Sequence, residues 1–349
     1  MYGNPPNPSG TGLAVPSSVS SVQPDGSLPA QPANPQSSSQ PGIELGALRI
    51  VFKTEAIDID SPPLARIRVF NLSDATVTKI KNEFQSLTLQ AGYENGNFGV
   101  IFQGTIIRIR RGRIDNLNSF IDILASNLDA IYNFGVVNTT LKAGSTPQQQ
   151  VAAVQKSVNS SPVAQGSAGA LAQGMQMGNI PNSFNTGGTL PRGKVMFGLA
   201  RTQLGKIADT AGAVWSIGPD GKINFHELTG FLPGEAVSIN AATGMIGVPE
   251  ATPQGVEVSC LLNPQIKTGT QIKLNNADIT QTTNQNSSVG FPAYGDFQFF
   301  ANTSSDGTYA SLVVEHEGDN RGSGDDFKTS IVALAVDATA GAGQVAAYG

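Results

Sequence analysis

The chain has 349 residues, a net charge of −5 and a single cysteine, Cys260. The acidic balance excludes a globally basic nucleic-acid-binding protein, and the lone thiol excludes an internal disulfide framework or a cysteine-rich metal site. Only 13% of the residues are charged, against roughly 25% in an average soluble domain, and the 40 glycines exceed the usual share. This composition favours a β-rich assembly protein that buries much of its surface against neighbouring subunits.

No apolar run reaches the length of about 18 residues that a membrane helix needs. The N-terminal sequence also lacks the charged and apolar regions of a signal peptide. We therefore expect a soluble protein made in a reducing compartment, with Cys260 serving as a small buried residue on a strand.

Residues 1–42 consist mainly of Pro, Ser, Gly, Gln and Asn. Such a segment cannot bury enough apolar area to offset its chain entropy. The composition predicts an arm that is disordered or ordered only by a partner. Regular structure is expected to begin in "IELGALRIVFKTEAI", where Leu48, Ile50 and Phe52 recur at every second position, as in a strand.

A second strand is predicted in "ARIRVFNL" (65–72), followed by a helix over about 74–84. Ser73 is a good N-cap for that helix, and its apolar stripe consists of Val77, Ile80 and Phe84. A run of strands follows, interrupted at Asn95-Gly96, a pair typical of a hairpin turn. "NSFIDILASNLDAIYNF" is interpreted as a further strand and a polar turn.

The middle of the chain is predicted to contain two helices. The first covers about 147–157, where Thr146 and Gln149 form a capping box around Pro147. The second is indicated by an apolar stripe that Gly212 can end; its members are Leu204, Ile207, Ala208 and Ala211. It is expected to pack on a hairpin made of "AVWSI" and "KINFHE", with Trp215 as a candidate anchor.

Between these helices, residues 158–190 are again low in complexity and are interpreted as a long mobile insertion or interface loop. From residue 236 onward the pattern indicates strands and turns. The last residues, 339–349, are predicted to form a flexible tail.

The segment "VVEHEGDNRGSGDDF" (313–327) is the most conspicuous candidate site. A zinc site needs several nitrogen or sulfur ligands, whereas only His316 is present. The three aspartates do not have the spacing of a calcium loop, although an irregular oxygen site stays open. The favoured interpretation is a glycine-rich turn after an edge strand, in which Arg321 pairs with an acid.

His226, the other histidine, lies in the predicted strand "NFHE", on the face opposite Phe225, and is interpreted as a solvated or hydrogen-bonded strand residue. "IIRIRRGRID" carries Arg108, Arg110, Arg111 and Arg113. A basic stripe of this kind could contact passing nucleic acid, but a solvated face or salt bridges to a neighbouring subunit fit better, because no aromatic residues interleave with the arginines.

No phosphate-binding glycine loop and no nucleophile-elbow motif occurs in the sequence. The residues alone therefore indicate a soluble, β-rich, multidomain protein that is not an enzyme and needs no cofactor.

Five stretches, in this order, resemble the baseplate hub proteins of contractile-tailed bacteriophages. They are "ARIRVFNLSDATVTKI", "LTLQAGYENGNFGVIFQGTI", "IDILASNLDAIYNFGVVNTTLKAGSTPQQQV", "ATGMIGVPEATPQGVEVSCLLNPQIKTGTQIKL" and "YASLVVEHEGDNRGSGDDFKT". The resemblance covers about 43–157 and 191–337, and it excludes the arm and the insertion.

The resemblance implies a mainly β fold with an α+β middle part and two tube-like β-barrel domains. The expected division is an arm at 1–42, a first barrel at 43–136, a helix-containing part at 137–235, a second barrel at 236–338 and the tail. Three copies would form a ring that joins the sixfold tail tube to the threefold central spike and encloses part of the DNA-ejection channel.

The implied location is the tail baseplate of a virion, assembled in the cytoplasm of a bacterial host. The implied partners are tail tube proteins, the central spike and passing DNA. For the arm and the insertion, which lie outside the shared pattern, we expect contacts with baseplate wedge or sheath-initiator proteins. In this family, the segment around His316 is the turn before the last barrel strand. Gly318, Gly322 and Gly324 are then expected to supply backbone freedom, and Asp319 and Arg321 to fix the turn or an intersubunit contact.

Three alternatives remain from the sequence. The first is the hub part of a type VI secretion or pyocin-like spike machine, which would share this architecture. The second is a virion-associated hydrolase, disfavoured because the two histidines lie far apart and no paired-carboxylate motif is present. The third is a receptor-binding adhesin, disfavoured because no fibrous repeat is visible.

Overall fold

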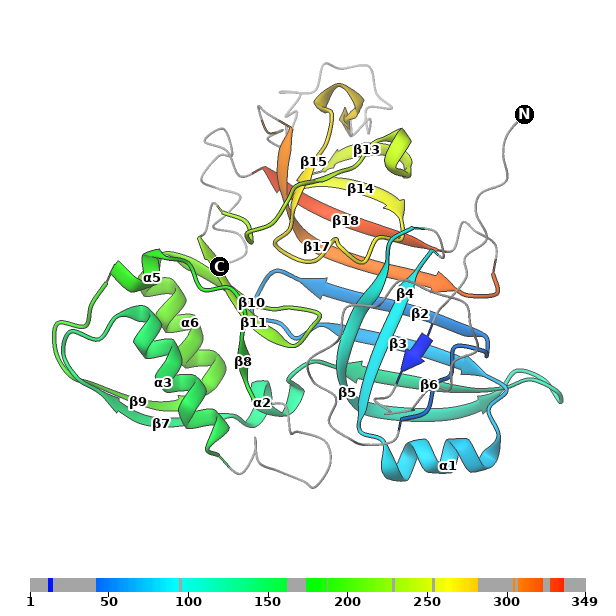
Figure 1. Cartoon of the computed structure of the whole chain (residues 1–349), viewed down its shortest axis with the longest axis horizontal. Coiled ribbons are helices and arrows are strands. Elements are labelled where there is room, and N and C mark those ends of the chain that lie inside the picture. Colours follow the sequence, from blue (N-terminus) through cyan, green and yellow to red (C-terminus); the bar gives the residue numbers. More distant parts are fainter. Residues whose placement is uncertain are drawn as a thin grey trace, which may run out of the picture.

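The computed structural model describes residues 12–14, 42–93, 96–161, 174–186, 188–227, 230–252, 255–281, 304, 307–322 and 327–335. This part of the chain is mainly β and is dominated by one large sheet, with a smaller α/β unit beside it (Figure 1). None of its helices is both long and apolar enough to cross a membrane. The predicted tail at 339–349 and nearly all of the arm lie outside the described residues.

The first half of the large sheet has the strand order β4-β5-β6-β3-β2. Its elements are β2 (Ile50–Ile57), β3 (Leu64–Phe70), α1 (Asp74–Glu83), β4 (Ser86–Gly92), β5 (Phe98–Arg113) and β6 (Ser119–Ser126). The long strand β5 pairs with β4 along its first part and with β6 along its second, with a register shift between Ile106 and Arg108. Such bulges bend a strand, and β4 and β5 cross over the other strands in Figure 1.

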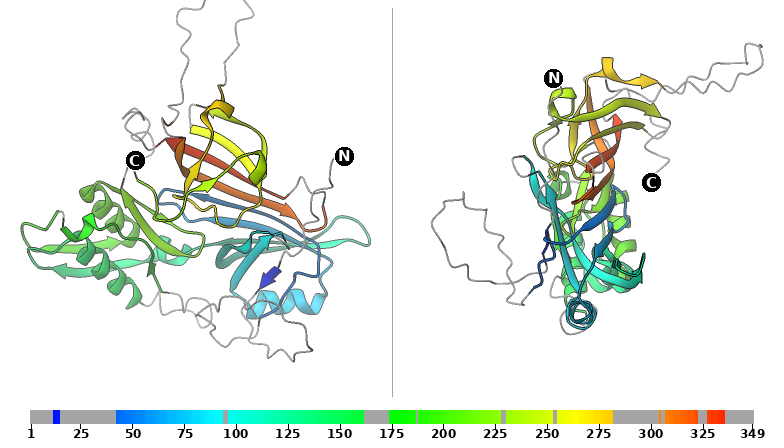
Figure 2. Two further views of the ribbon diagram at one scale, coloured as in Figure 1. Left: turned by 45° about the horizontal axis from the view of Figure 1, so that its top comes forward. Right: turned by 90° about the vertical axis from the view of Figure 1, so that its right-hand side faces the viewer.

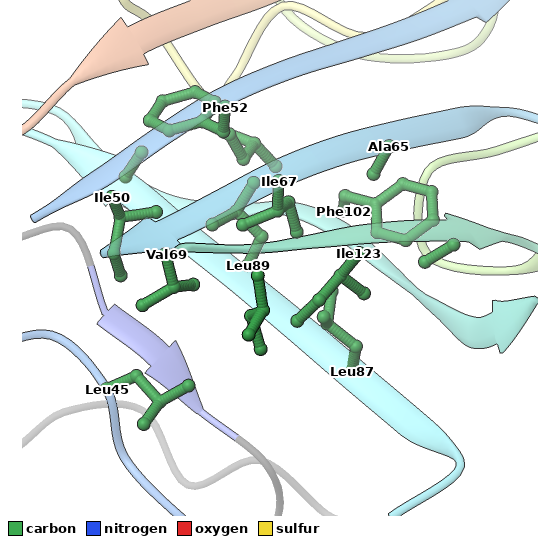
Figure 3. Close-up of a cluster of buried hydrophobic side chains, with 14 of the residues drawn as sticks. Leu45, Ile50, Phe52, Ala65, Ile67, Val69, Leu87, Leu89, Phe102 and Ile123 are labelled. Atoms are coloured by element: carbon green, nitrogen blue, oxygen red, sulfur yellow. The ribbon is translucent and has the colours of Figure 1, made fainter. Parts of the chain in front are cut away.

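Alternation decides which side of this half-sheet is apolar. In β3, Ala65, Ile67 and Val69 are buried in the first hydrophobic core (Figure 3). Arg66 and Arg68 alternate with them and face the other side. Helix α1 adds Val77 and Ile80 to that core. The face that carries this apolar core is called the core face here, and the opposite one the outer face.

The second half of the sheet continues directly from the first, because β2 pairs antiparallel with β17 (Thr308–Asp319) from Ile57↔Val313 to Val51↔Asp319. Next come β18 (Lys328–Ala335), β14 (Gly255–Leu261) and β13 (Met245–Thr252). Shorter elements complete this region: β12 (Val237–Ser238), β15 (Gln271–Lys273), β16 (Thr280–Gln281) and two 3-10 turns at Ala241–Thr243 and Asn276–Asp278. Cys260 is buried in its core, as predicted, and burial raises the pKa of its thiol to about 12.

The α/β unit lies beside the sheet in both Figure 1 and the left view of Figure 2. Its elements are α2 (Asp129–Phe134), β7 (Val136–Leu141), α3 (Pro147–Asn159), β8 (Gln176–Met177), α5 (Ser183–Thr186), β9 (Lys194–Leu199), α6 (Ala200–Ala211), β10 (Ala213–Ile217) and β11 (Lys222–Glu227). Strands β7 and β9 form a two-stranded ribbon, and β10, β11 and β8 form a separate sheet. Helices α3 and α6 pack against this framework over a third core that includes Trp215.

The local signals predicted these two helices well. Thr146 Oγ1 accepts a bond from Gln149 N at 3.3 Å, and Gln149 Oε1 accepts one from Thr146 N at 3.2 Å, so the capping box is present. Helix α6 ends at Gly212, whose φ of 65° lies in the left-handed region that favours glycine. The hairpin of β10 and β11 is confirmed as well.

Three segment predictions are wrong in part. Within the supposed mobile insertion at 158–190, residues 174–186 are packed, because Met175 and Phe184 are buried in the core of the α/β unit and β8 pairs with β11. The polar turn expected after β6 contains helix α2, which is anchored by buried Ile131. In the arm, β1 (Gly12–Ala14) pairs with β4 of the same chain, so these three residues are ordered without a partner protein.

The described residues contain three hydrophobic cores, two under the halves of the large sheet and one in the α/β unit. Leu262 and Phe327, from the second half of the sheet, belong to the first core. The division into two barrels and a middle part, with the boundaries given above, stays a prediction.

Candidate functional site

The conspicuous C-terminal segment is divided between a strand and a turn. His316 to Asp319 form the end of β17, and the turn follows at Asn320. Residues 323–326, which include Gly324 and two of the three aspartates, lie outside the described residues. Alternation in β17 places His316 on the core face and Glu317 and Asp319 on the outer face. The histidine and these acids therefore do not converge on a common point.

His316 is a buried, uncharged residue. Its Nδ1 lies 2.9 Å from Thr329 Oγ1 on the neighbouring strand β18, and the backbone of Ile266 also bonds to the ring. Burial lowers the pKa of His316 to about 4, so the ring is neutral at pH 7. Among the residues that the structure describes, no group of three or more His, Cys, Asp or Glu side chains could hold a metal ion.

Asp319 fixes the turn onto the segment that precedes β2. Arg49 Nη2 lies 2.6 Å from Asp319 Oδ2, and Asp319 Oδ1 accepts a bond from Arg321 N at 3.0 Å. Burial alone would raise the pKa of Asp319. The hydrogen bonds from Arg49 and from the backbone of Arg321 and Gly322 outweigh this effect, so the net shift of the pKa is downward. The carboxylate therefore stays charged and holds the turn closed.

The expected pairing of Arg321 with an acid is not what the described residues show. Its guanidinium donates to the carbonyl of Ala47 at 2.7 Å, while Arg49 pairs with Asp319. Gly322 N donates to Asp319 O at 3.1 Å and closes the turn. These contacts lie within one chain, and an intersubunit role for His316, Asp319, Arg321 and Gly322 stays a prediction.

Gly318 serves packing rather than backbone freedom, contrary to expectation. It lies inside β17, and its φ is not in the left-handed region. A Cβ at this position would lie 2.4 Å from the Phe327 ring and 2.8 Å from the Phe52 ring. These two rings meet edge to face, with centroids 5.7 Å apart. The glycine is needed because two aromatic rings occupy the space beside its backbone.

The four arginines of β5 are divided between the two faces of the sheet. Arg108 and Arg110 lie on the outer face, opposite Leu124 and Asp122 of β6. Arg111 points to the other side, where it forms a salt bridge with Asp74 of α1. Arg113 follows Arg111 at the strand period of two. The sequence therefore carries two pairs of arginines rather than one basic stripe.

The outer face of the large sheet is crossed by rows of charged side chains. One row runs through Asp319, Val51, Arg68, Asp122 and Arg110 on five adjacent strands. Asp122 forms salt bridges with Arg68 at 2.6 Å and with Arg110 at 2.8 Å. The hydrogen bond from Arg68 is the largest of the effects that lower the pKa of Asp122.

A second, parallel row runs through Lys328, Glu317, Lys53, Arg66, Leu124 and Arg108. Lys328 pairs with Glu317 at 2.9 Å, and Lys53 pairs with Glu315 at 2.7 Å. Arg66 and Arg108 differ from these lysines, because no ion pair joins either of them to an acid among the described residues.

These rows line an open hollow of about 780 Å³ on the outer face. Its charged lining consists of Lys53, Arg66, Arg68, Arg108, Arg110, Asp122, Glu317 and Asp319, five cations and three acids. The hollow is therefore locally basic although the whole chain carries a net charge of −5. No signal in the sequence places these residues together, because the pairing of β2 with β17 joins segments about 270 positions apart.

His226 forms a buried contact between the α/β unit and the large sheet. Its Nε2 lies 2.7 Å from Oδ2 of Asp58, the residue after β2, and its Nδ1 lies 2.8 Å from the carbonyl of Glu227. Burial lowers the pKa of His226, but the Asp58 carboxylate outweighs that effect and the net shift is upward. Of the two roles predicted for this histidine, the hydrogen-bonded one is correct and the solvated one is wrong.

A second polar contact holds the same unit in place. The side chain of Asn127 donates to the carbonyls of Gly218 and Pro219 in the turn between β10 and β11, at 3.1 and 3.0 Å. The backbone N of Gln103 also donates to the carbonyl of Pro219 at 2.9 Å. The hairpin tip is therefore fixed to the large sheet through backbone carbonyls.

No family model matches the chain, and no curated protein matches its sequence. Its fold is similar to that of the prophage MuSo2 43 kDa tail protein from Shewanella oneidensis, with a TM-score of 0.51 and 8% identity over 85% of this chain and 95% of that one. Weaker likenesses are to a tail protein from Neisseria meningitidis MC58 (TM-score 0.47, 8% identity, 81% and 91% covered) and to the E. coli c3393 protein, a component of the type VI secretion system (0.45, 8%, 83% and 74%).

The resemblance inferred from the sequence is thus confirmed at the level of the fold. Along most of its length, this chain has a fold similar to that of a phage tail protein. At 8% identity the likeness concerns the fold alone.

Proposed function

We propose that this chain is a structural protein of a contractile tail, the baseplate hub that joins the sixfold tail tube to the threefold central spike. The observation that carries the proposal is the pairing of β2 with β17, which makes one continuous wall out of two β regions. The similarity in fold to a prophage tail protein supports a tail-associated structural role.

In this proposal the two β regions act as two tube-like barrels. Three chains then supply six such units, which match one sixfold disc of the tube at a threefold spike. The outer face of the sheet, with its charged rows, is the wall of the channel, and the core face is turned away from it. The ring is located in the baseplate of the virion and is assembled in the cytoplasm of the host.

The outer side of the β7–β9 ribbon is a candidate contact between copies. Val136, Val195 and Phe197 lie on that side and are 42, 72 and 71% exposed. Exposed apolar clusters of this kind mark interaction surfaces. Tail tube, spike, and wedge or sheath-initiator proteins are the further partners that the hub position requires.

The test is the mass of the purified protein by light scattering, followed by negative-stain imaging. A particle of three times 36.2 kDa with an axial hole is expected. Phe197→Ser should reduce the trimer fraction, whereas Val248→Ser should not, because Val248 is similarly exposed (61%) on a different element, β13. A stable dimer, or a compact particle without a hole, contradicts the proposal.

The hub part of a type VI secretion or pyocin-like spike machine is the second candidate, since the same wall would serve either machine. Imaging separates the two: the protein should be found in the tail baseplate of phage particles if the first proposal is correct. A virion-associated hydrolase is the remaining alternative, and a zymogram on purified protein tests it.

A further inference from the structure

We infer that the hollow on the outer face of the sheet binds nucleic-acid phosphates through Arg66 and Arg108. The inference deepens the proposed function and rests on it for the place where nucleic acid would meet this face. The positions of Arg66 and Arg108 and the charges around them are observed in the single chain and do not depend on the trimer.

Arg66 and Arg108 flank one apolar side chain. Arg66 of β3 lies opposite Leu124 of β6, and Leu124 lies opposite Arg108 of β5. The two arginines are therefore two strand spacings apart, about 10 Å. Both are exposed, and both project from the same face. Leu124 cannot neutralise either one, so the pair presents two neighbouring positive charges to whatever occupies the hollow.

The other charges of the hollow are largely neutralised within the chain. Asp122 is shared by Arg68 and Arg110, and Asp319 is paired with Arg49. The remaining acid of the lining, Glu317, is paired with Lys328. No acid of the described lining is thus left over for Arg66 or Arg108. A guanidinium group favours phosphate because its planar fork donates two parallel bonds.

The surroundings favour a phosphate backbone over a protein surface. On the outer face, Arg66 is flanked by the cations Lys53 and Arg68 as well as by Leu64 and Leu124, so this surface is not depleted of charge as the centre of a protein interface is. A polyanion, by contrast, needs only cations along its path.

Among the residues that the structure describes, no uncovered aromatic ring lies on this face near the two arginines to stack on a base. The guanidinium of Arg49 lies 4.9 Å from the centre of the Phe70 ring, and that of Arg68 lies 4.3 Å from the centre of the Phe120 ring. Both rings are therefore covered. Contact is expected with phosphates alone, and it should be weak, independent of sequence and sensitive to salt.

The experiment uses the full-length chain and a fluorescently labelled short DNA duplex of random sequence. Anisotropy titrations from roughly 50 to 200 mM salt should give a linear fall of log K with log salt, at about 0.9 for each phosphate contact. Arg66→Gln and Arg108→Gln should each lower the slope by about 1 and weaken binding uniformly across sequences. The double variant should lower the slope by about 2.

Arg113→Gln is the matched control, because Arg113 is an exposed arginine of the same strand on the opposite face. It should leave both the affinity and the slope unchanged. An equal loss with Arg113→Gln, or none with the double variant, overturns the inference. If polyglutamate displaces the duplex at a lower charge concentration than unlabelled DNA does, the site prefers an acidic protein segment and the nucleic-acid assignment is wrong.

Formation of the trimeric ring and binding of phosphate can be tested separately. Light scattering on the same variants reports the trimer, and the titrations report phosphate binding. A trimer whose binding does not depend on Arg66 and Arg108 refutes only the inference, whereas a stable dimer that binds through both arginines refutes only the hub.

Discussion

His226 and His316 are both buried, yet the fold gives them opposite protonation behaviour. The His226 ring lies 2.7 Å from a carboxylate, and the pKa of His226 is raised. The His316 ring lies 2.9 Å from a hydroxyl, and burial lowers the pKa of His316 to about 4. His226 makes a buried hydrogen-bonded contact between two parts of the molecule, whereas His316, which lies among acids in the sequence, contacts only a hydroxyl and the backbone. A histidine's role therefore depends on partners that the fold brings to it.

The largest effect is expected from removing one partner of the His226–Asp58 pair. Asp58→Ala should lower the free energy of unfolding by about 3–5 kcal/mol, because it leaves a buried imidazole without its acceptor. Urea unfolding measures the change. The double variant Asp58→Leu/His226→Phe should recover much of the loss, since it removes both polar groups. A single variant within about 1 kcal/mol of the parent would show that the contact is dispensable.

The second prediction uses pH to separate the two histidines. The folded pKa of His316, about 4, lies below the ordinary value of 6.5, so the unfolded chain takes up this proton first as the pH falls. Stability should therefore decrease from about pH 6.5 to 4, by about 3 kcal/mol in total. For His226 the sign is reversed, because its folded pKa is raised: its contribution is complete below pH 6.5 and is lost as the pH rises through the folded value.

Urea midpoints measured across this pH range test both limbs. His316→Gln should reduce the loss of stability between pH 6.5 and 4. His226→Gln should reduce the loss of stability above pH 6.5. If His316→Gln leaves the loss of stability between pH 6.5 and 4 unchanged, folding does not lower the pKa of His316.

The third prediction concerns the packing beside His316. Gly318→Ala should destabilise the protein by about 1–3 kcal/mol, because the new methyl group must displace the rings of Phe327 and Phe52. Gly234→Ala is the control, since a Cβ there meets nothing within 4 Å. Thermal unfolding compares the two variants, and equal melting temperatures would mean that the rings move aside freely.

The smallest effects are expected in the turn after β17. Asp319→Asn should cost about 1 kcal/mol, because Arg49, its partner, is half exposed and the pair is partly screened by solvent. Arg321→Ala should cost less, since it removes one exposed bond to the carbonyl of Ala47. An effect of Arg321→Ala on the mass of the assembly, with unfolding of the chain unchanged, would instead support an intersubunit contact.

Local features of the fold could be predicted from the sequence, whereas contacts between distant segments could not. The alternation in β3, the capping box at Thr146 and the end of α6 at Gly212 each depend on neighbouring residues, and all are confirmed. The Asp58–His226 contact joins residues 168 positions apart, which no periodicity can indicate. The burial of Met175 and Phe184 could not be predicted, because the apolar residues of this segment are scattered among glycine and polar residues with neither a helical nor a strand period.

The pairing of β2 with β17 also has a consequence for how the chain folds. Arg49 and Asp319, at one end of this pairing, are 270 positions apart, so closing it requires a very large loop. Non-local strand pairing of this kind makes folding slow. During synthesis the first half of the sheet emerges well before β17, and the edge of β2 stays unpaired until then. That edge is open to pairing with other chains, so the hazard of misassembly is concentrated in the interval before β17 leaves the ribosome.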